Sequence, residues 1–341
     1  MIEENISLKK YNTFGVDAIA RYFARFASLD DLCAHLEFTP LSTTAQLLPR
    51  LILGGGSNLL FTKNFDGIVL KNELGGIEKI SEDKSYVYIK AGAGVNWHQL
   101  VIHCIQNNWA GMENLSLIPG NVGASPMQNI GAYGVEVKDV FFELEAFHLM
   151  DKKVVTFNLQ ECEFGYRESV FKRTLINQFI ILNVTYRLNK VPVFNTSYGA
   201  IEQELAAMGV AELSIQAISQ AVIHIRRSKL PNPADIGNAG SFFKNPEITA
   251  QQFASLKKDF PDIIGYSLGV DKVKLAAGWL IEQCGWKGYR KGDAGCHSNQ
   301  ALVLVNYGHA TGSEIFDLSE TIIATVADKF GVALEREVNI I

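Results

Sequence analysis

The chain lacks paired cysteines, an excess of positive charge and any long apolar run. Its five cysteines are scattered and none belongs to a C-x-x-C pair, so neither a disulfide framework nor a zinc site is indicated. Scattered free thiols are typical of a reducing compartment, and we expect a cytoplasmic protein. The formal net charge is −5 and no basic block is present, which argues against nucleic acid and anionic membranes as partners.

The chain also lacks targeting and nucleotide-binding signatures. Its polar N-terminus has no apolar signal-peptide core, and no stretch approaches the roughly 18 apolar residues of a membrane span, so we expect no membrane insertion. No complete G-x-G-x-x-G, G-x-x-x-x-G-K-[ST], G-x-S-x-G or H-E-x-x-H occurs. A Rossmann site, a P-loop, a nucleophile elbow and a zincin site are therefore not predicted, and we expect no metal.

What is present is a chain of 341 residues, longer than the roughly 250–300 residues at which a single core stops growing. We therefore expect two or three domains of α+β class, with more strands in the first half and more helices in the second. Alternating or β-branched runs predict strands at 47–53, 86–90 and 179–188, and a hairpin from 141–150 and 154–157.

Apolar residues at helical spacing predict four helices. Asn96 and Ser214 cap the first two, and the other two span 273–284 and about 313–330. The last residues, 334–341, have the pattern of a strand. A proline-rich break at 231–233 marks a domain boundary near the second helix.

The first of two glycine-rich segments directly follows the predicted strand at 47–53. It consists of Gly54, Gly55, Gly56, Ser57 and Asn58. Such a composition lets backbone N–H groups converge on an anion, which suits a pyrophosphate. A plain turn is the alternative interpretation.

The second segment, 118–134, contains four glycines and two prolines, which rule out a regular helix or strand. It is also partly apolar, and ordering such a segment is costly unless something fills it. A flat ligand with a polar rim would fit, with Ser125, Gln128 and Asn129 available to hydrogen-bond that rim. An extended surface loop is the alternative.

These two segments resemble the FAD-binding domain of the vanillyl-alcohol-oxidase-type flavoproteins, and specifically the UDP-N-acetylenolpyruvoylglucosamine reductase family. Three later segments extend the resemblance: FGYRES at 164–169, GNAGSFFKNP at 237–246 and LEREV at 334–338, where Arg336 replaces the usual proline. The resemblance implies a PCMH-type FAD-binding domain in two lobes, at 1–69 with 330–341 and at 70–213. It implies an α+β substrate-binding domain at 214–329.

The reaction implied by the resemblance is the NADPH-dependent, FAD-mediated reduction of UDP-N-acetylglucosamine enolpyruvate to UDP-N-acetylmuramate in peptidoglycan precursor synthesis. Negative charge would build at C2 of the enolpyruvyl group and spread into its carboxylate. Arg167 suits the role of gripping that carboxylate through two parallel hydrogen bonds. Ser241 suits the proton donor at C2. Glu337 corresponds to the family's catalytic glutamate.

The resemblance also implies binding residues. The FAD residues are Gly54, Gly55, Gly56, Ser57, Asn58, Pro119, Gly120, Gly123, Ser125, Gln128, Asn129, Gly131 and Arg226. The substrate residues are Tyr133, Tyr166, Tyr198, Lys229, Asn245 and Gln300. Residues 194–199 resemble the tyrosine-bearing loop of the loop-bearing type I members, with Tyr198 as the lid tyrosine.

Further departures from the family pattern concern individual substrate contacts and not the reaction. Asn339 replaces an arginine of some relatives, and Gly295 and Cys296 replace Ala and Val. Two other functions stay open: a flavin-dependent oxidase of the same fold, which would not need an intact 237–246 segment, and an inactive UDP-sugar-binding module, which would be expected to lack one of the three reacting residues. We expect a monomer whose partners are the UDP-sugar and NADPH.

Overall fold

The computed structural model describes residues 1–38 and 48–341, which form two compact units. Unit 1 consists of Met1–Ile6, Arg21–Gly55 and Asp66–Ser228, and unit 2 consists of Ser7–Ala20, Gly56–Phe65 and Lys229–Ile341. A unit boundary therefore falls just before the proline-rich break at 231–233. The division into two lobes and a third domain stays a prediction. No helix among the described residues is long and apolar enough to cross a membrane.

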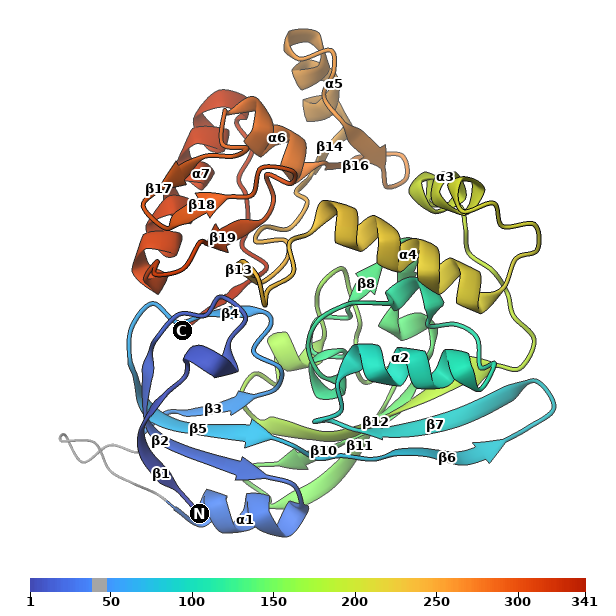
Figure 1. Ribbon diagram of the computed structural model, residues 1–341, viewed down its shortest axis with the longest axis vertical. Coiled ribbons are helices and arrows are strands. Elements are labelled where there is room, and N and C mark those ends of the chain that lie inside the picture. Colours follow the sequence, from blue (N-terminus) through green and yellow to red (C-terminus); the bar gives the residue numbers. More distant parts are fainter. Residues whose placement is uncertain (39–47) are drawn as a thin grey trace. The chain divides into compact units, whose positions relative to one another are not determined.

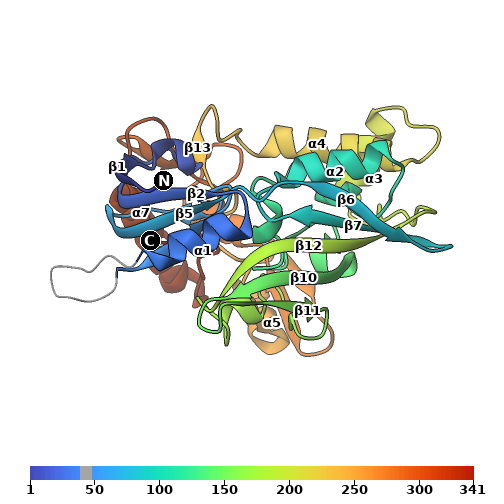
Figure 2. The same cartoon turned by 90° about the horizontal axis from the view of Figure 1, so that it is seen from below.

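The first sheet of unit 1 has four strands in the order β1-β2-β5-β3. Their bounds are β1 Glu3–Ser7, β2 Ile19–Phe26, β3 Arg50–Leu53 and β5 Phe65–Asn72, and β3 runs parallel to β5. Helix α1 (Leu29–Glu37) packs on this sheet through buried Leu32, which belongs to one apolar cluster with Ile68 and Leu70 (Figure 2). The strand predicted at 47–53 is thus confirmed from Arg50, while Leu47 lies outside the described residues.

The second sheet of unit 1 is antiparallel, in the order β11-β10-β12-β7-β6. Its strands are β6 Ile77–Glu82, β7 Tyr86–Gly92, β10 Phe141–His148, β11 Lys153–Asn158 and β12 Phe179–Asn189, which confirms the predicted strands and hairpin. Helix α2 (Trp97–Gln106) covers this sheet (Figure 1), because its apolar stripe, including Leu100 and Cys104, is fully buried. The predicted cap is confirmed, since Asn96 accepts a hydrogen bond from the Gln99 N–H.

Two further helices and a short hairpin complete unit 1. Helices α3 (Gly199–Ala207) and α4 (Ile215–Lys229) pack together through an apolar cluster that includes Ile201, Leu205, Ile218 and Val222. The Ser214 side chain caps α4 by accepting from the Ala217 N–H. The hairpin pairs β8 (Gly131–Ala132) with β9 (Val135–Glu136) inside the second glycine-rich segment and just after it.

Unit 2 contains two small antiparallel sheets. The first has the order β13-β19-β18-β17 and the second β14-β16-β15. Helix α7 packs on the first sheet with α6 beside it, and α5 packs on the second (Figure 1). Their bounds are β13 Gly237–Asn238, β14 Glu247–Thr249, α5 Ala250–Asp259, β15 Gly265–Ser267, β16 Lys272–Leu275, α6 Ala277–Gln283, β17 Arg290–Lys291, β18 Ala294–Cys296, β19 Leu304–Asn306 and α7 Gly312–Phe330.

Two predicted elements of unit 2 are wrong in extent. The helix predicted at 273–284 is a strand, β16, followed by α6, because Val273 and Leu275 alternate into the core while β16 pairs with strands on both sides. The strand predicted at 334–341 shrinks to β20 (Asn339–Ile340), which pairs with β4 (Leu59–Leu60), and to one isolated bridge at Arg336.

The start of α7 matches its sequence signals closely. Thr311 accepts from the Glu314 N–H while the Glu314 carboxylate accepts from the Thr311 N–H, and Gly331 ends the helix at φ 64°. We predict that Thr311→Ala lowers the free energy of unfolding by about 1 kcal/mol, because the Glu314 N–H loses its side-chain acceptor. Urea unfolding measures this loss of free energy. Thr321→Ala, on the exposed side of the same helix, is the control, and an equal loss there would contradict the capping assignment.

Candidate active site

The predicted site residues divide between the two units, and each set is described by itself. Unit 1 holds Gly54, Gly55, Pro119, Gly120, Gly123, Ser125, Gln128, Asn129, Gly131, Tyr133, Tyr166, Arg167, Tyr198 and Arg226. Unit 2 holds Gly56, Ser57, Asn58, Lys229, Ser241, Asn245, Gln300 and Glu337.

The two glycine-rich segments meet inside unit 1. A Cβ added at Gly55 would lie 2.8 Å from the Gly120 Cα and 2.9 Å from the Asn121 Oδ1. Neighbouring backbone bonds fix this approach, since Trp97 N–H donates to the Gly120 carbonyl and the Asn121 amide donates to the Gly94 carbonyl. A side chain at position 55 is therefore excluded, and the main chain there can approach a ligand closely.

A lysine that the sequence analysis missed lies beside the first glycine segment. The Lys71 Nζ donates to the Gly54 carbonyl at 2.7 Å, and burial lowers the pKa of this ammonium group. A partly buried cation next to converging main-chain groups suits a phosphate. Its only sequence signal is a lysine at the end of the buried run in β5.

Four residues of this region have a left-handed backbone although none is glycine. They are Leu117, Asn129, Tyr133 and Arg167, with φ between 44° and 58°. Such conformations are costly for residues with a side chain and persist where surrounding contacts hold them, most often at functional sites.

Arg167 is held by its own unit. Its Nη2 donates to the Gly131 carbonyl at 2.7 Å, and its guanidinium lies 5.4 Å from the Tyr166 ring centroid. Arg226 donates through Nε to the Leu117 carbonyl, and its side chain hydrogen-bonds the Tyr133 phenol. Desolvation, with the Arg167 charge nearby, lowers the pKa of Arg226. Two guanidinium groups in one half-buried region favour an anionic ligand.

Tyr198, the predicted lid tyrosine, contacts Tyr133 within unit 1. The rings of Tyr133 and Tyr198 meet edge to face at 5.4 Å between centroids, and Tyr198 is 50% exposed. Buried Asn114 donates to the carbonyls of both Tyr133 and Asn195, which ties the lid segment to the second glycine-rich segment. The sequence analysis missed Asn114, which carries no motif of its own.

Ser241 and Glu337 lie on neighbouring segments of unit 2. Glu337 N–H donates to the Phe242 carbonyl at 2.9 Å and Lys244 N–H donates to the Glu335 carbonyl at 2.8 Å. Gly240, at φ 71°, precedes the serine and bends the chain there. The structure therefore places the two predicted residues on adjoining segments that are joined by main-chain hydrogen bonds.

The terminal segment is anchored on both sides. Arg336, which replaces the usual proline, donates to the Ser319 hydroxyl and pairs with Glu320 on α7. The Asn58 amide donates to the Glu337 carbonyl, and the Asn339 amide donates to the Asn58 carbonyl. Asn58 and Asn339 thus fix the backbone at Glu337.

Asn245 and Gln300 lie beside the start of α6. Asn245 Oδ1 accepts from the Ala277 N–H, and a Cβ at Gly278 would lie 2.9 Å from the Gln300 Oε1. Lys229 is exposed at the end of α4.

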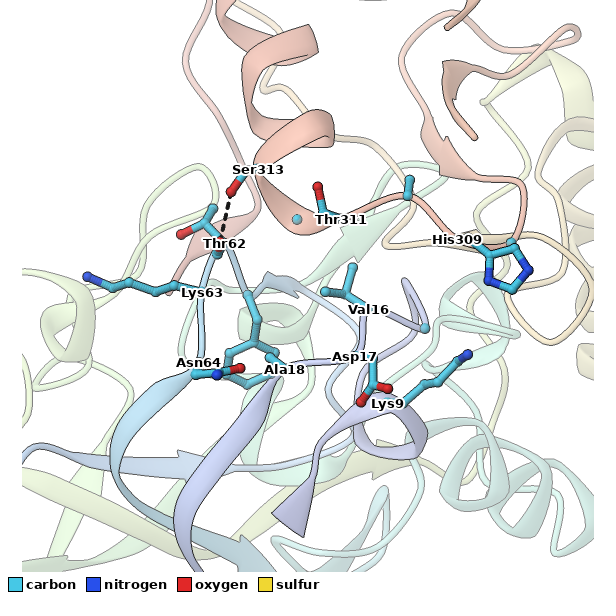
Figure 3. Close-up of a pocket in the computed structure, with 15 residues that line it drawn as sticks. Lys9, Val16, Asp17, Ala18, Thr62, Lys63, Asn64, His309, Thr311 and Ser313 are labelled. Carbon is cyan, nitrogen blue, oxygen red and sulfur yellow. Dashed lines mark hydrogen bonds between the residues drawn. The ribbon is translucent and has the colours of Figure 1, made fainter. Parts of the chain in front are cut away.

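A pocket elsewhere in unit 2 contains none of these residues. It has a volume of about 390 Å³ and lies between the Val16 and Thr62 segments and the start of α7, where the Ser313 hydroxyl donates to the Thr62 carbonyl (Figure 3). Its Lys9 and Lys63 are accompanied by Asp17, so charge does not select a ligand there.

Comparisons with known proteins identify the family. Residues 22–158 match the family model of an FAD binding domain, and residues 232–341 match that of the UDP-N-acetylenolpyruvoylglucosamine reductase C-terminal domain. A UDP-N-acetylenolpyruvoylglucosamine reductase of Amoebophilus asiaticus is 52% identical over 340 residues, or 100% of this chain and 99% of that protein. This chain belongs to the UDP-N-acetylenolpyruvoylglucosamine reductase family.

Other members of the reductase family agree over the same length. That of Flavobacterium johnsoniae is 48% identical over 100% of this chain and 99% of its own, and that of Pseudomonas putida is 47% identical over 99% and 98%. The crystal structure of the Thermus caldophilus reductase shares the fold, with a TM-score of 0.66, 24% identity and coverage of 100% and 98%. The predicted family and fold class are confirmed.

Membership makes the chain an FAD-dependent oxidoreductase, and unit 1 fits that cofactor. The side-chain-free contact of Gly55 with Gly120 leaves main-chain groups exposed for a diphosphate, and Lys71 adds a cation beside it. Among the described residues, no group of three or more His, Cys, Asp or Glu side chains is arranged to hold a metal ion.

We predict that Gly55→Ala weakens FAD binding about tenfold or more, because a Cβ there would overlap Gly120 and overpacking costs about 1–3 kcal/mol. Titration of the apoprotein with FAD measures the affinity. Gly75→Ala is the control in the same unit, since its added Cβ would meet only the Glu73 carbonyl oxygen, at 4.0 Å. Equal affinities in the two variants would contradict the role of the glycine contact.

Proposed function

We propose that the chain reduces UDP-N-acetylglucosamine enolpyruvate to UDP-N-acetylmuramate with NADPH, a step of peptidoglycan precursor synthesis. Full-length identity to the named reductases supports the reaction. The structural observation that carries it is the main-chain hydrogen bonding between the Ser241 and Glu337 segments, which gives unit 2 a hydroxyl-bearing and a carboxyl-bearing residue on adjoining segments. The loop-bearing type is supported by Tyr198 against Tyr133.

Bound FAD supplies the hydride transfer from NADPH to C3 of the enolpyruvyl group. Arg167 binds the substrate carboxylate, because a planar guanidinium can donate two parallel hydrogen bonds to the two carboxylate oxygens. Charge that develops at C2 spreads into this carboxylate, so the fixed cation stabilises the transition state more than the ground state. The Gly131 carbonyl holds one end of the guanidinium in advance.

Ser241 delivers the proton to C2. Its place after Gly240 and before buried Phe242 lets the backbone approach the substrate while water is kept away. A serine hydroxyl is a weak acid, so neighbouring groups have to replace its proton and stabilise the oxygen. Glu337 polarises the carboxylate region, and its backbone is fixed by the Phe242 and Asn58 contacts.

The remaining assignments belong to the same proposal. FAD binds to main-chain groups at 54–58 and 119–123 and to residues of the 125–131 stretch, with Arg226 on the flavin side. Tyr133, Tyr166, Tyr198, Asn245 and Gln300 contact the UDP-sugar, and Lys229 contacts a diphosphate. We propose a cytoplasmic monomer, and its five unpaired cysteines are typical of a reducing compartment.

An anaerobic experiment tests the reaction. The yellow holoenzyme is reduced with one equivalent of NADPH, the enolpyruvyl UDP-sugar is added, and flavin absorbance near its visible maximum is followed. We expect reoxidation with formation of UDP-N-acetylmuramate. Reoxidation by oxygen but not by the UDP-sugar would replace this proposal with an oxidase, and binding without reoxidation would leave only a binding module.

Ser241→Ala separates proton delivery from the earlier step. We predict that reoxidation by the UDP-sugar slows by about 10²–10⁴-fold, the usual contribution of a positioned acid. Flavin reduction by NADPH should change by less than about twofold, since no proton reaches C2 in that half-reaction. Stopped-flow absorbance measures both rates. The exposed Ser298→Ala is the control in the same unit, and a similar fall in both half-reactions would argue against the acid role.

A further inference from the structure

We infer that Asn129 is a positioning residue for Arg167, not a side-chain contact of the cofactor. This inference rests on the proposed role of Arg167. Asn129 is 0% exposed, and both amide donors and the carbonyl oxygen of its side chain hydrogen-bond groups of unit 1. Its Nδ2 donates to the Gly165 carbonyl and to the Glu136 Oε2, both at 3.0 Å, and its Oδ1 accepts from the Lys138 N–H at 3.1 Å.

These bonds use both amide donors of Asn129. An asparagine side chain has two N–H donors and one carbonyl acceptor, so no donor remains for a flavin carbonyl or ring nitrogen. The side chain faces the second glycine-rich segment from inside the unit. Its chemistry is that of a cross-link between three chain segments.

One end of the cross-link controls the turn that carries Arg167. Gly165 and Glu168 form an isolated bridge around Tyr166 and Arg167, and Arg167 sits at φ 57° within it. A left-handed conformation is costly for a residue other than glycine, so surrounding contacts have to hold it. The Asn129 bond to the Gly165 carbonyl is one of them, and the Ser169 hydroxyl bond to the Met127 carbonyl is another, at 2.7 Å.

The other end controls the group that Arg167 grips. The Gly131 carbonyl accepts from the Arg167 Nη2, and Gly131 pairs with Glu136 in the β8–β9 hairpin. Asn129 holds the Glu136 carboxylate and the Lys138 backbone, so it fixes the second strand of that hairpin. Both the backbone of Arg167 and the partner of its guanidinium therefore depend on one buried amide.

Charge explains why an amide is needed at this position. The Glu136 carboxylate already pairs with the Lys138 ammonium at 2.8 Å. A carboxylate at position 129 would lose both donors and place a like charge against Glu136 in a buried site. Asn129→Asp is therefore a nearly isosteric change that breaks both donated bonds while it keeps the acceptor for Lys138.

The test compares Asn129→Asp and Asn129→Gly with Arg167→Lys. Glycine removes the side chain without strain, because Asn129 has φ 44°. Asn177→Asp and Asn177→Gly are matched controls, since Asn177 is also left-handed, at φ 59°, and is exposed. For each variant we would measure FAD affinity of the apoprotein, urea unfolding, the affinity of the holoenzyme for UDP-N-acetylmuramate from flavin spectral shifts, and the rates of both half-reactions.

We expect the Asn129 variants to bind the product more weakly and to be reoxidised by the enolpyruvyl UDP-sugar about 10- to 100-fold more slowly, in the range that small misplacement produces. FAD affinity and flavin reduction by NADPH should stay within about twofold, because no cofactor contact is lost. The Asn177 variants should match the parent protein.

Other outcomes are separable. A loss of FAD affinity with unchanged reoxidation of the FAD-saturated enzyme would overturn the inference and restore a cofactor contact. If Arg167→Lys itself left reoxidation unchanged, the proposed role of Arg167 would fail instead. If both Asn129 variants failed to fold, Ser169→Ala, which removes only the bond to Met127, should show the same pattern to a smaller degree, and a normal reoxidation rate there would contradict the inference.

Discussion

The close contact between the Gly55 and Gly120 backbones is the constraint on which the unit 1 site depends. A side chain at position 55 would overlap Gly120 and the Asn121 side chain, so peptide groups of residue 55 form the contact. Peptide N–H groups are fixed dipoles that bind an anion without needing to be ordered first. Backbone hydrogen bonds beside this contact fix the start of the 121–134 stretch. The Trp97 N–H donates to the Gly120 carbonyl, and the Val122 N–H donates to the Val95 carbonyl.

Buried amides replace regular secondary structure along residues 111–138. This stretch has only short 3-10 turns and one small hairpin, so few ladder hydrogen bonds hold it. Asn114 joins it to the lid segment, and Asn129 joins it to the turn that carries Arg167. A buried amide bonded at both ends is costly to disrupt, because its partners would be left without hydrogen bonds. Strained backbones at Tyr133 and Arg167 persist within this framework.

Unit 2 positions its own predicted residues, Ser241 and Glu337, by another route. Asn58 and the two segments at 240–244 and 335–337 come from three distant parts of the chain, and main-chain hydrogen bonds join them side by side. Arg336 shows how a departure from the family pattern is accommodated, since it anchors the terminal segment on α7 where proline is usual. The main-chain hydrogen bonds between these segments set the backbone positions of Ser241 and Glu337.

The amino-acid sequence by itself determined the family, the α+β class and the helices α2, α4 and α7, and its motifs predict Arg167, Ser241 and Glu337 as the reacting residues, because motifs, caps and apolar periodicity are local signals. It did not determine β16, whose residues fit a helix as well as a strand until pairing partners on both sides were present. Nor did it reveal Lys71, Asn114 or the hydrogen-bond partners of the Asn129 side chain. Those depend on which carbonyl groups lie within 3 Å of an amide or ammonium group, and only tertiary packing brings such distant groups together.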